Sequence, residues 1–229
     1  MPIGYEELLP EILPLVPGCP DSLIENTIRS AVIELCQKSE VYQIGLDPVS
    51  TFPNMHEYDL EAPRETSVQK ILWATHEGRD LEPVTTTLLE QRLPRWRNKS
   101  EAGVPQYFVQ QTAKTFWLAP VPAVQKINST IVRAVLKPTF DSKACDTDVM
   151  NDYRDTIING ALFRLLRMPN KEWSDLPSAA VYGQLFTNGI EDAERRARKA
   201  DTAVTRRVKY GGTSAGAWRT RGRRYGKGG

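Results

Sequence analysis

The stretch whose spacing comes closest to a catalytic motif is Gly212-Thr213-Ser214-Ala215-Gly216, which matches the G-x-S-x-G pattern of a nucleophilic serine. That chemistry needs a strand before the serine, a helix after it and a histidine later in the chain. The flanks here are rich in glycine and arginine, and both histidines, His56 and His76, precede the serine. We therefore expect no nucleophilic catalysis and a protein that is not an enzyme.

Metal and cofactor chemistry is not indicated either. The histidines are far apart, and Cys19, Cys36 and Cys145 lack the spacing of zinc ligands or of a disulfide framework. Such scattered cysteines suit a reducing compartment. Neither a phosphate-binding glycine loop nor a dinucleotide fingerprint occurs. The sequence predicts no metal site and no cofactor.

The C-terminal tail carries the strongest binding signal, because cations, aromatic rings and glycines alternate along it. Arginine and lysine pair with phosphates and aromatic rings stack on bases, so the tail could grip nucleic acid. Trp, Tyr and Arg are also the commonest hot spots of protein interfaces, and a flexible segment can order on docking. These residues do not decide between nucleic acid and a protein as the partner. A third interpretation is that the tail only solubilises the chain. The candidate binding residues are Arg206, Arg207, Lys209, Tyr210, Trp218, Arg219, Arg221, Arg223, Arg224 and Tyr225.

The charge is distributed asymmetrically. From Arg195 to Gly229 there are 12 Lys and Arg residues and one acid, a balance of +11. The other 194 residues carry 18 bases and 27 acids, a balance of −9, which leaves the net charge of +2. An acidic body with a basic tail predicts two surfaces for different partners. No apolar run is long enough for a membrane span, and the N-terminus lacks the basic region of a signal peptide.

Helices should carry this tail. Apolar residues recur at helical period over residues 22–39 and 148–167, and Pro169 should end the second helix. Ser22 and Glu25 fit a capping box, and Asp146 offers a further N-cap oxygen. We expect the two helices to pack together, and mid-helix Gly160 to mark a close neighbour.

A third helix is predicted from Asp175 or Ser178 to residue 200. Its small-residue face should allow close packing, and its last turns become charged. We expect that charged end to project into solvent or into a partner.

Between the helices the period of the pattern changes. Residues 57–60, 68–74, 81–84 and 130–137 resemble strands, residues 107–109 and 115–118 a hairpin, and residues 85–92 a short helix. The sequence thus predicts an α+β chain: a bundle of about three helices, an inserted antiparallel β-sheet or barrel-like domain of about five strands, and an extended basic C-terminal tail. The expected boundaries are 1–41 for the N-terminal segment and first helix, 42–140 for the β domain, 141–200 for the helical hairpin and 201–229 for the tail.

Several short patterns resemble one family. They include the stretch from Asn159 to Pro169, the following Trp173-Ser174-Asp175, and Phe186-x-x-Gly189-Ile190-x-x-Ala193. Earlier segments agree, namely residues 33–39, Tyr58-x-Leu60 and the stretch from Leu118 to Pro122. In these segments the chain is similar to the tailed-phage adaptor proteins that join the portal to the tail.

The resemblance implies a structural head-to-tail adaptor at the portal vertex of the virion, assembled in the host cytoplasm. It implies a ring, typically of twelve copies, that lies below the portal, links the capsid to the tail and lines the channel for genomic double-stranded DNA. The implied partners are further copies of the chain, the portal protein and a tail or nozzle protein. Family members often have C-terminal extensions that dock on the portal, so we expect the tail to dock there. The alternative is a nucleic-acid-binding protein that grips phosphates with its tail.

Overall fold

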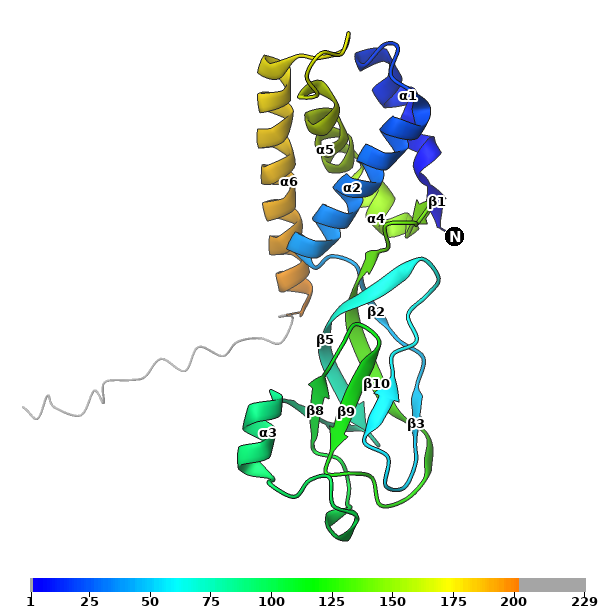
Figure 1. The fold of residues 1–229 in the computed structure, drawn as a ribbon, viewed down its shortest axis with the longest axis vertical. Coiled ribbons are helices and arrows are strands. Elements are labelled where there is room, and N and C mark those ends of the chain that lie inside the picture. The colour runs from blue at the N-terminus through cyan, green and yellow to red at the C-terminus, as the bar shows by residue number, and fades with distance from the viewer. Residues whose placement is uncertain (1, 202–229) are drawn as a thin grey trace, which may run out of the picture.

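The computed structural model describes residues 2–201. Figure 1 shows these residues as an elongated molecule with a helical layer at one end and a β part at the other. The expected α+β class with antiparallel sheets is confirmed. One pair of strands, β7 and β8, departs from it by running parallel.

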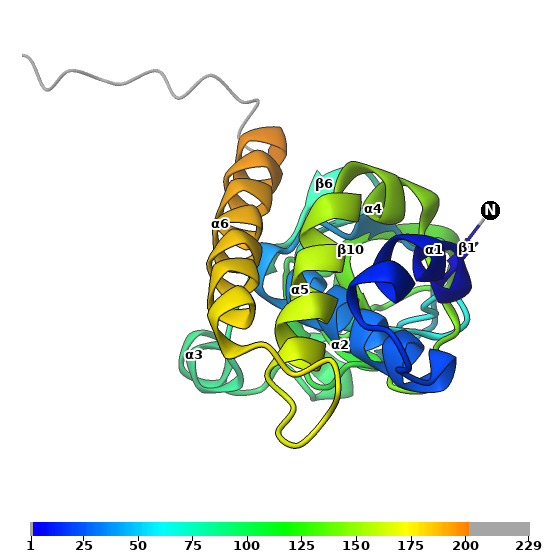
Figure 2. The same ribbon diagram turned by 90° about the horizontal axis from the view of Figure 1, so that it is seen from above.

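The helical layer contains more helices than the expected bundle of about three. Its three long helices are α2 (Asp21–Ser39), α5 (Arg154–Leu166) and α6 (Leu176–Asp201). Two short helices complete the layer, α1 (Leu9–Ile12) between the 3-10 turns η1 (Tyr5–Leu8) and η2 (Leu13–Leu15), and α4 (Thr147–Asp152). As predicted, α2 packs against α5, and α6 packs against both (Figure 2).

Two details of the helix boundaries correct the sequence reading. The single helix expected over 148–167 is interrupted at Tyr153, whose φ of −117° and ψ of 21° are not helical, so α4 and α5 are separate. The capping box at Ser22 is also wrong, because α2 begins at Asp21 and the Pro20 carbonyl accepts the amide hydrogens of Leu23 and Ile24. The cap at Asp146 is confirmed, since its side chain accepts the Asp148 amide at 3.0 Å.

The β part consists of two sheets that curl into a half-barrel. One sheet has the order β2 (Gln43–Gly45), β10 (Lys126–Pro138), β5 (Thr66–His76) and β6 (Arg79–Asp80), with β3 (Val49–Thr51) also on β10. The other has the order β4 (Glu57–Asp59), β9 (Thr115–Ala119), β8 (Tyr107–Gln110) and β7 (Glu82–Pro83). Helix α3 (Thr86–Arg92) and the 3-10 turn η3 (Lys99–Glu101) lie between β7 and β8 in sequence.

The predicted hairpin is confirmed, with Tyr107 opposite Ala119 and Gln110 opposite Phe116. The long strands β5 and β10 also lie where strands were expected, although each extends further. A third, two-stranded sheet pairs β1 (Ile3–Gly4) with β11 (Ala144–Cys145), which joins the N-terminus to the entry of α4.

A single hydrophobic core runs from the helical layer into the half-barrel. It includes Leu35 of α2 and Leu162 of α5 at one end and Phe116 and Leu118 between the sheets at the other. A smaller cluster around Trp96 and Leu89 lies under α3. The expected four-part division of the chain stays a prediction.

Candidate functional site

The residues considered for catalysis have structural surroundings. His76 is buried and its ring nitrogen Nδ1 lies 3.0 Å from the Thr130 hydroxyl, and burial lowers the pKa of His76. His56 meets the rings of Trp96 and Trp117 edge-on, with centroids 5.5 and 5.6 Å away. Over residues 2–201, no group of three or more His, Cys, Asp or Glu side chains is placed to hold a metal ion. The G-x-S-x-G stretch lies outside the described residues.

The three cysteines are buried and unpaired. A hydrogen bond with the Cys145 thiol, together with burial, raises the pKa of Cys36 well above its usual value. The Cys36 thiol therefore stays protonated at neutral pH and is a poor nucleophile. These side chains pack the core and offer no reactive site.

The scaffold that holds the tail depends on an interlock between α5 and α6. A Cβ atom on Gly160 of α5 would lie 2.6 Å from the Phe186 ring of α6 and 2.9 Å from Cβ of Ala31 in α2. Similarly, Gly183 of α6 leaves room for the Phe163 ring of α5: a Cβ atom on Gly183 would lie 2.9 Å from that ring. Each helix thus presents a glycine to the other's aromatic ring, and the close neighbour expected at Gly160 is Phe186.

Arg164 ties three helices together at the same place. Its guanidinium donates to the Gly160 carbonyl at 2.7 Å and forms an ion pair with Glu34 of α2. It also lies over the Phe186 ring, 5.2 Å from the centroid. The Arg164 side chain is only 18% exposed, and burial lowers the pKa of its guanidinium. Glu34 is thus the counter-charge that offsets the cost of burying this cation.

We expect Glu34→Ala to destabilise the fold by about 1–2 kcal/mol in urea unfolding, because Arg164 then loses its carboxylate in a largely desolvated place. Lys38→Ala is the matched control, since it removes the other ion pair of Glu34, whose lysine is 61% exposed. That variant should lose no more than about 0.5 kcal/mol. Equal losses in the two variants would contradict a special role for the pair with Arg164.

Helix α6 changes character along its length. The exposed face of its first half includes large apolar side chains, with Val181 60% and Leu185 45% exposed. Its last turns are charged, with ion pairs from Arg195 to Asp192 and from Arg198 to Glu194. Ala193 and Ala197 nevertheless stay buried. The charged side chains of this end are exposed to solvent, as expected, whereas its alanine face stays packed as far as the junction with the β part (Figure 1).

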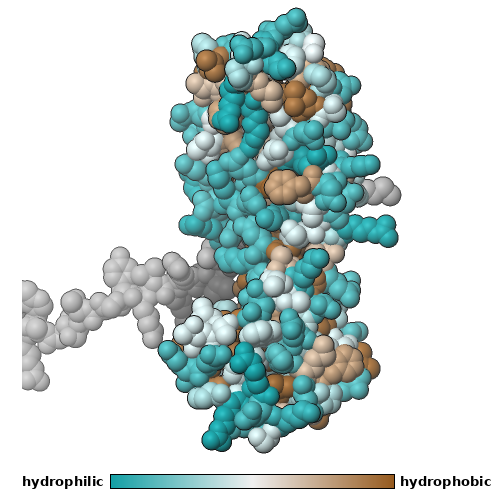
Figure 3. Space-filling view, viewed as in Figure 1, coloured by the Kyte–Doolittle hydropathy of each residue, from teal (hydrophilic) through white to brown (hydrophobic). Residues whose placement is uncertain are grey.

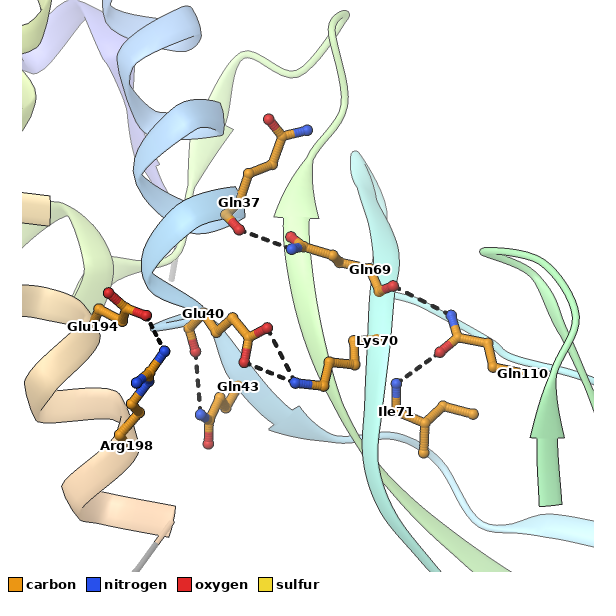
Figure 4. Close-up of polar contacts among 9 residues, drawn as sticks. All are labelled: Gln37, Glu40, Gln43, Gln69, Lys70, Ile71, Gln110, Glu194 and Arg198. Carbon is orange, nitrogen blue, oxygen red and sulfur yellow. Dashed lines mark hydrogen bonds and ion pairs between the residues drawn. The ribbon is translucent and has the colours of Figure 1, made fainter. Parts of the chain in front are cut away.

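That junction is cross-linked by polar contacts (Figure 4). Lys70 of β5 forms an ion pair with Glu40 at 3.2 Å, and the Gln69 amide donates to the Gln37 carbonyl at 2.8 Å. Gln110 of β8 accepts the Ile71 amide at 2.8 Å, which ties the second sheet to the first. Glu194 and Arg198 of α6 lie beside this network in the same view. The tail thus starts from a fixed position beside the middle of the molecule.

All ten candidate tail residues, Arg206 to Tyr225, lie outside the described residues, so their role stays a prediction. The sequence reading also missed one surface. Large apolar side chains are exposed at the end of the β part farthest from the helices, including Phe52, Val124 and Ile127. The sequence signal for it is the lack of Asp, Glu, Lys and Arg over residues 48–56, 102–113 and 115–125.

The described residues thus form a helical layer joined through one hydrophobic core to a half-barrel. Comparison with known families defines the class: the chain is a phage head-to-tail adaptor. A family profile described as SU10 adaptor protein matches residues 5–209, and the chain belongs to that family. No curated protein matches the chain. None of the described helices is both long and apolar enough to cross a membrane.

Proposed function

We propose that this adaptor forms a closed ring below the portal, lines the channel through which DNA passes, and docks on the portal with its C-terminal tail. The observation that carries the proposal is the family match over residues 5–209. Membership of this family implies a structural protein that lies at the junction of portal and tail. The ring, its twelve copies and the DNA channel follow from the resemblance to portal–tail adaptors.

The charge distribution supports a channel role. Residues 1–194 carry the net balance of −9, and a negative wall repels the DNA backbone and does not hold it. Self-repulsion of such bodies also disfavours a ring of free subunits. We therefore infer that the ring assembles on the portal, which gathers the copies.

The position of α6 supports docking by the tail. The helix is held by the glycine interlock and ends beside the junction, so the tail begins from a rigid base. The 28 residues beyond Asp201 can span up to about 90 Å when extended, enough to reach a neighbouring protein in the virion. Their arginines, Trp218 and Tyr225 are residue types that dominate protein interfaces.

The alternative, a tail that grips DNA, is favoured by the same arginines. It predicts affinity for free duplex DNA that falls steeply with salt. Eight Lys and Arg residues lie in 205–229, so full phosphate contact would give a slope of about −7 in log K against log salt. Portal docking without DNA contact predicts no such binding.

The test is the mass of the protein in solution, alone and mixed with the portal of the same phage. Twelve copies of a 25.8 kDa chain add about 310 kDa to the portal. We expect that gain in native mass spectrometry or light scattering, with smaller species when the protein is alone. A strict monomer under both conditions would overturn the ring.

A further inference from the structure

The end of the β part farthest from the helical layer is built from three loops, residues 52–56, 102–106 and 120–125. Backbone hydrogen bonds join them: the Asn54 amide donates to the Pro122 carbonyl at 3.0 Å, and the Gly103 amide to the Val121 carbonyl at 2.8 Å. The Ala123 amide in turn donates to the Gly103 carbonyl at 3.1 Å. We call these loops, together with the adjoining Ile127, the β tip.

The β tip is apolar and uncharged. Its three loops contain no Asp, Glu, Lys or Arg, although charged residues make up 25% of the chain. In Figure 3 hydrophobic residues gather at this end of the molecule, over the edge formed by β3 and the start of β10. The large exposed side chains are Phe52 (43%), Met55 (44%), Val104 (46%), Val124 (56%) and Ile127 (76%). Several large apolar side chains exposed at one end of a molecule mark a candidate interaction site.

The β tip is also held in shape before any partner binds. The Tyr58 hydroxyl donates to the Met55 carbonyl at 2.8 Å and accepts the Phe52 amide at 3.2 Å, which fixes the first loop. Val121 is buried in the cluster around Trp96, which fixes the third. A surface whose loops are already ordered loses little conformational entropy on docking.

The chemistry of the surroundings favours a protein partner over a membrane. Apolar loops that insert into anionic bilayers are accompanied by clusters of lysine and arginine. Lys126, which lies between the third loop and Ile127, forms an ion pair with Glu77 at 2.9 Å. An apolar centre flanked by such a charge pair matches the anatomy of a protein interface, where charged residues are depleted from the core of the contact.

We propose that the β tip docks the tail protein that follows the adaptor, and that this protein meets it with an uncharged, apolar surface. The proposal rests on the proposed function and on one further premise, that the long axis of each subunit runs along the axis of the ring. The β tips of all copies then lie at one end of the ring and face the component beyond it. A partner without charge fits because a charged side chain placed against these loops would be desolvated without a counter-charge.

The test uses phage that carry Val124→Lys/Ile127→Lys in the adaptor gene. Both side chains are more than half exposed, so the charges should disrupt docking without touching the core. Phe140→Lys is the matched control: Phe140 is an 82% exposed hydrophobic in the loop after β10, at the other end of that 13-residue strand. Thermal melting of the purified variants checks that each folds.

We expect the double variant to give DNA-filled heads with adaptor at the wild-type level and at least tenfold fewer tailed particles, counted by electron microscopy and titre. The Phe140→Lys phage should be tailed normally. Wild-type numbers of tailed particles in the double variant would overturn the proposal. So would double-variant heads without adaptor, since the β tip would then face the portal. An adaptor missing from wild-type heads would instead contradict the proposed function.

Discussion

Deletion of residues 205–229 is expected to abolish co-assembly with the portal and to leave the folded body intact. The fold should survive because α6 stays packed through Ala193 and Ala197, and Ala197 is the last buried core residue in the part of the chain that the structure describes. Binding should be lost because the deletion removes every candidate hot spot of the tail. The measurement is the amount of adaptor that sediments with the portal, beside a urea unfolding curve that should match that of the full chain.

Two sets of substitutions distinguish the contribution of the aromatic rings to portal binding from that of the positive charges. Trp218→Ala/Tyr225→Ala removes aromatic anchors and keeps the charge, whereas Arg221→Gln/Arg223→Gln/Arg224→Gln removes three charges and keeps the rings. Docking on a protein predicts that the aromatic pair causes the larger loss, of at least tenfold, since buried aromatic anchors dominate interfaces. A truncated chain that occupies the portal at the full level would refute docking by the tail.

Gly160→Val should strongly destabilise the helical layer. The new side chain would meet the Phe186 ring and Cβ of Ala31, neither of which can retreat, because Phe186 is 3% exposed and Ala31 fully buried. Removing a mid-helix glycine favours the helix slightly, but overpacking a core costs about 1–3 kcal/mol and sometimes more. We expect a loss of about 3 kcal/mol, a large share of the stability of a typical domain.

Gly45→Val is the control, because Gly45 has open space where its Cβ would stand. Urea unfolding should show that variant within about 0.5 kcal/mol of the wild type. If the two valine variants were equally stable, the interlock between α5 and α6 would not be the tight contact described here. Combining Gly160→Val with Phe186→Leu should recover part of the loss, since the two positions share one space.

The sequence predicted most long elements because their patterns are strong. Helix α2 and the hairpin of β8 and β9 follow from periodicity, and the Asp146 cap from side-chain chemistry. Short strands were missed: β2 and β3 have three residues each and are paired only through β10, so their stability comes from tertiary contacts that no local pattern records. The break at Tyr153 was also not predicted, because the apolar stripe of the helix continues through it.

The two candidate interaction surfaces differ in how far the sequence predicts them. The tail could be predicted as a binding segment because its composition differs from that of the body. The family was indicated by short motifs, most of them in the helices. The β tip could not be predicted, because its three loops are distant in sequence and only the backbone bonds at Asn54, Gly103 and Ala123 bring them together. The lack of charge in each loop indicates an interaction surface only when the three loops are known to lie together.

The core that continues from the helices into the half-barrel has a mechanical consequence. Leu162 near one end and Phe116 near the other belong to the same packed cluster, and the ion pair of Lys70 and Glu40 braces its surface. Well-packed interiors have low compressibility and transmit strain. We therefore expect a push along the long axis to be transmitted through the packed core, so that a load at the β tip reaches the end of α6.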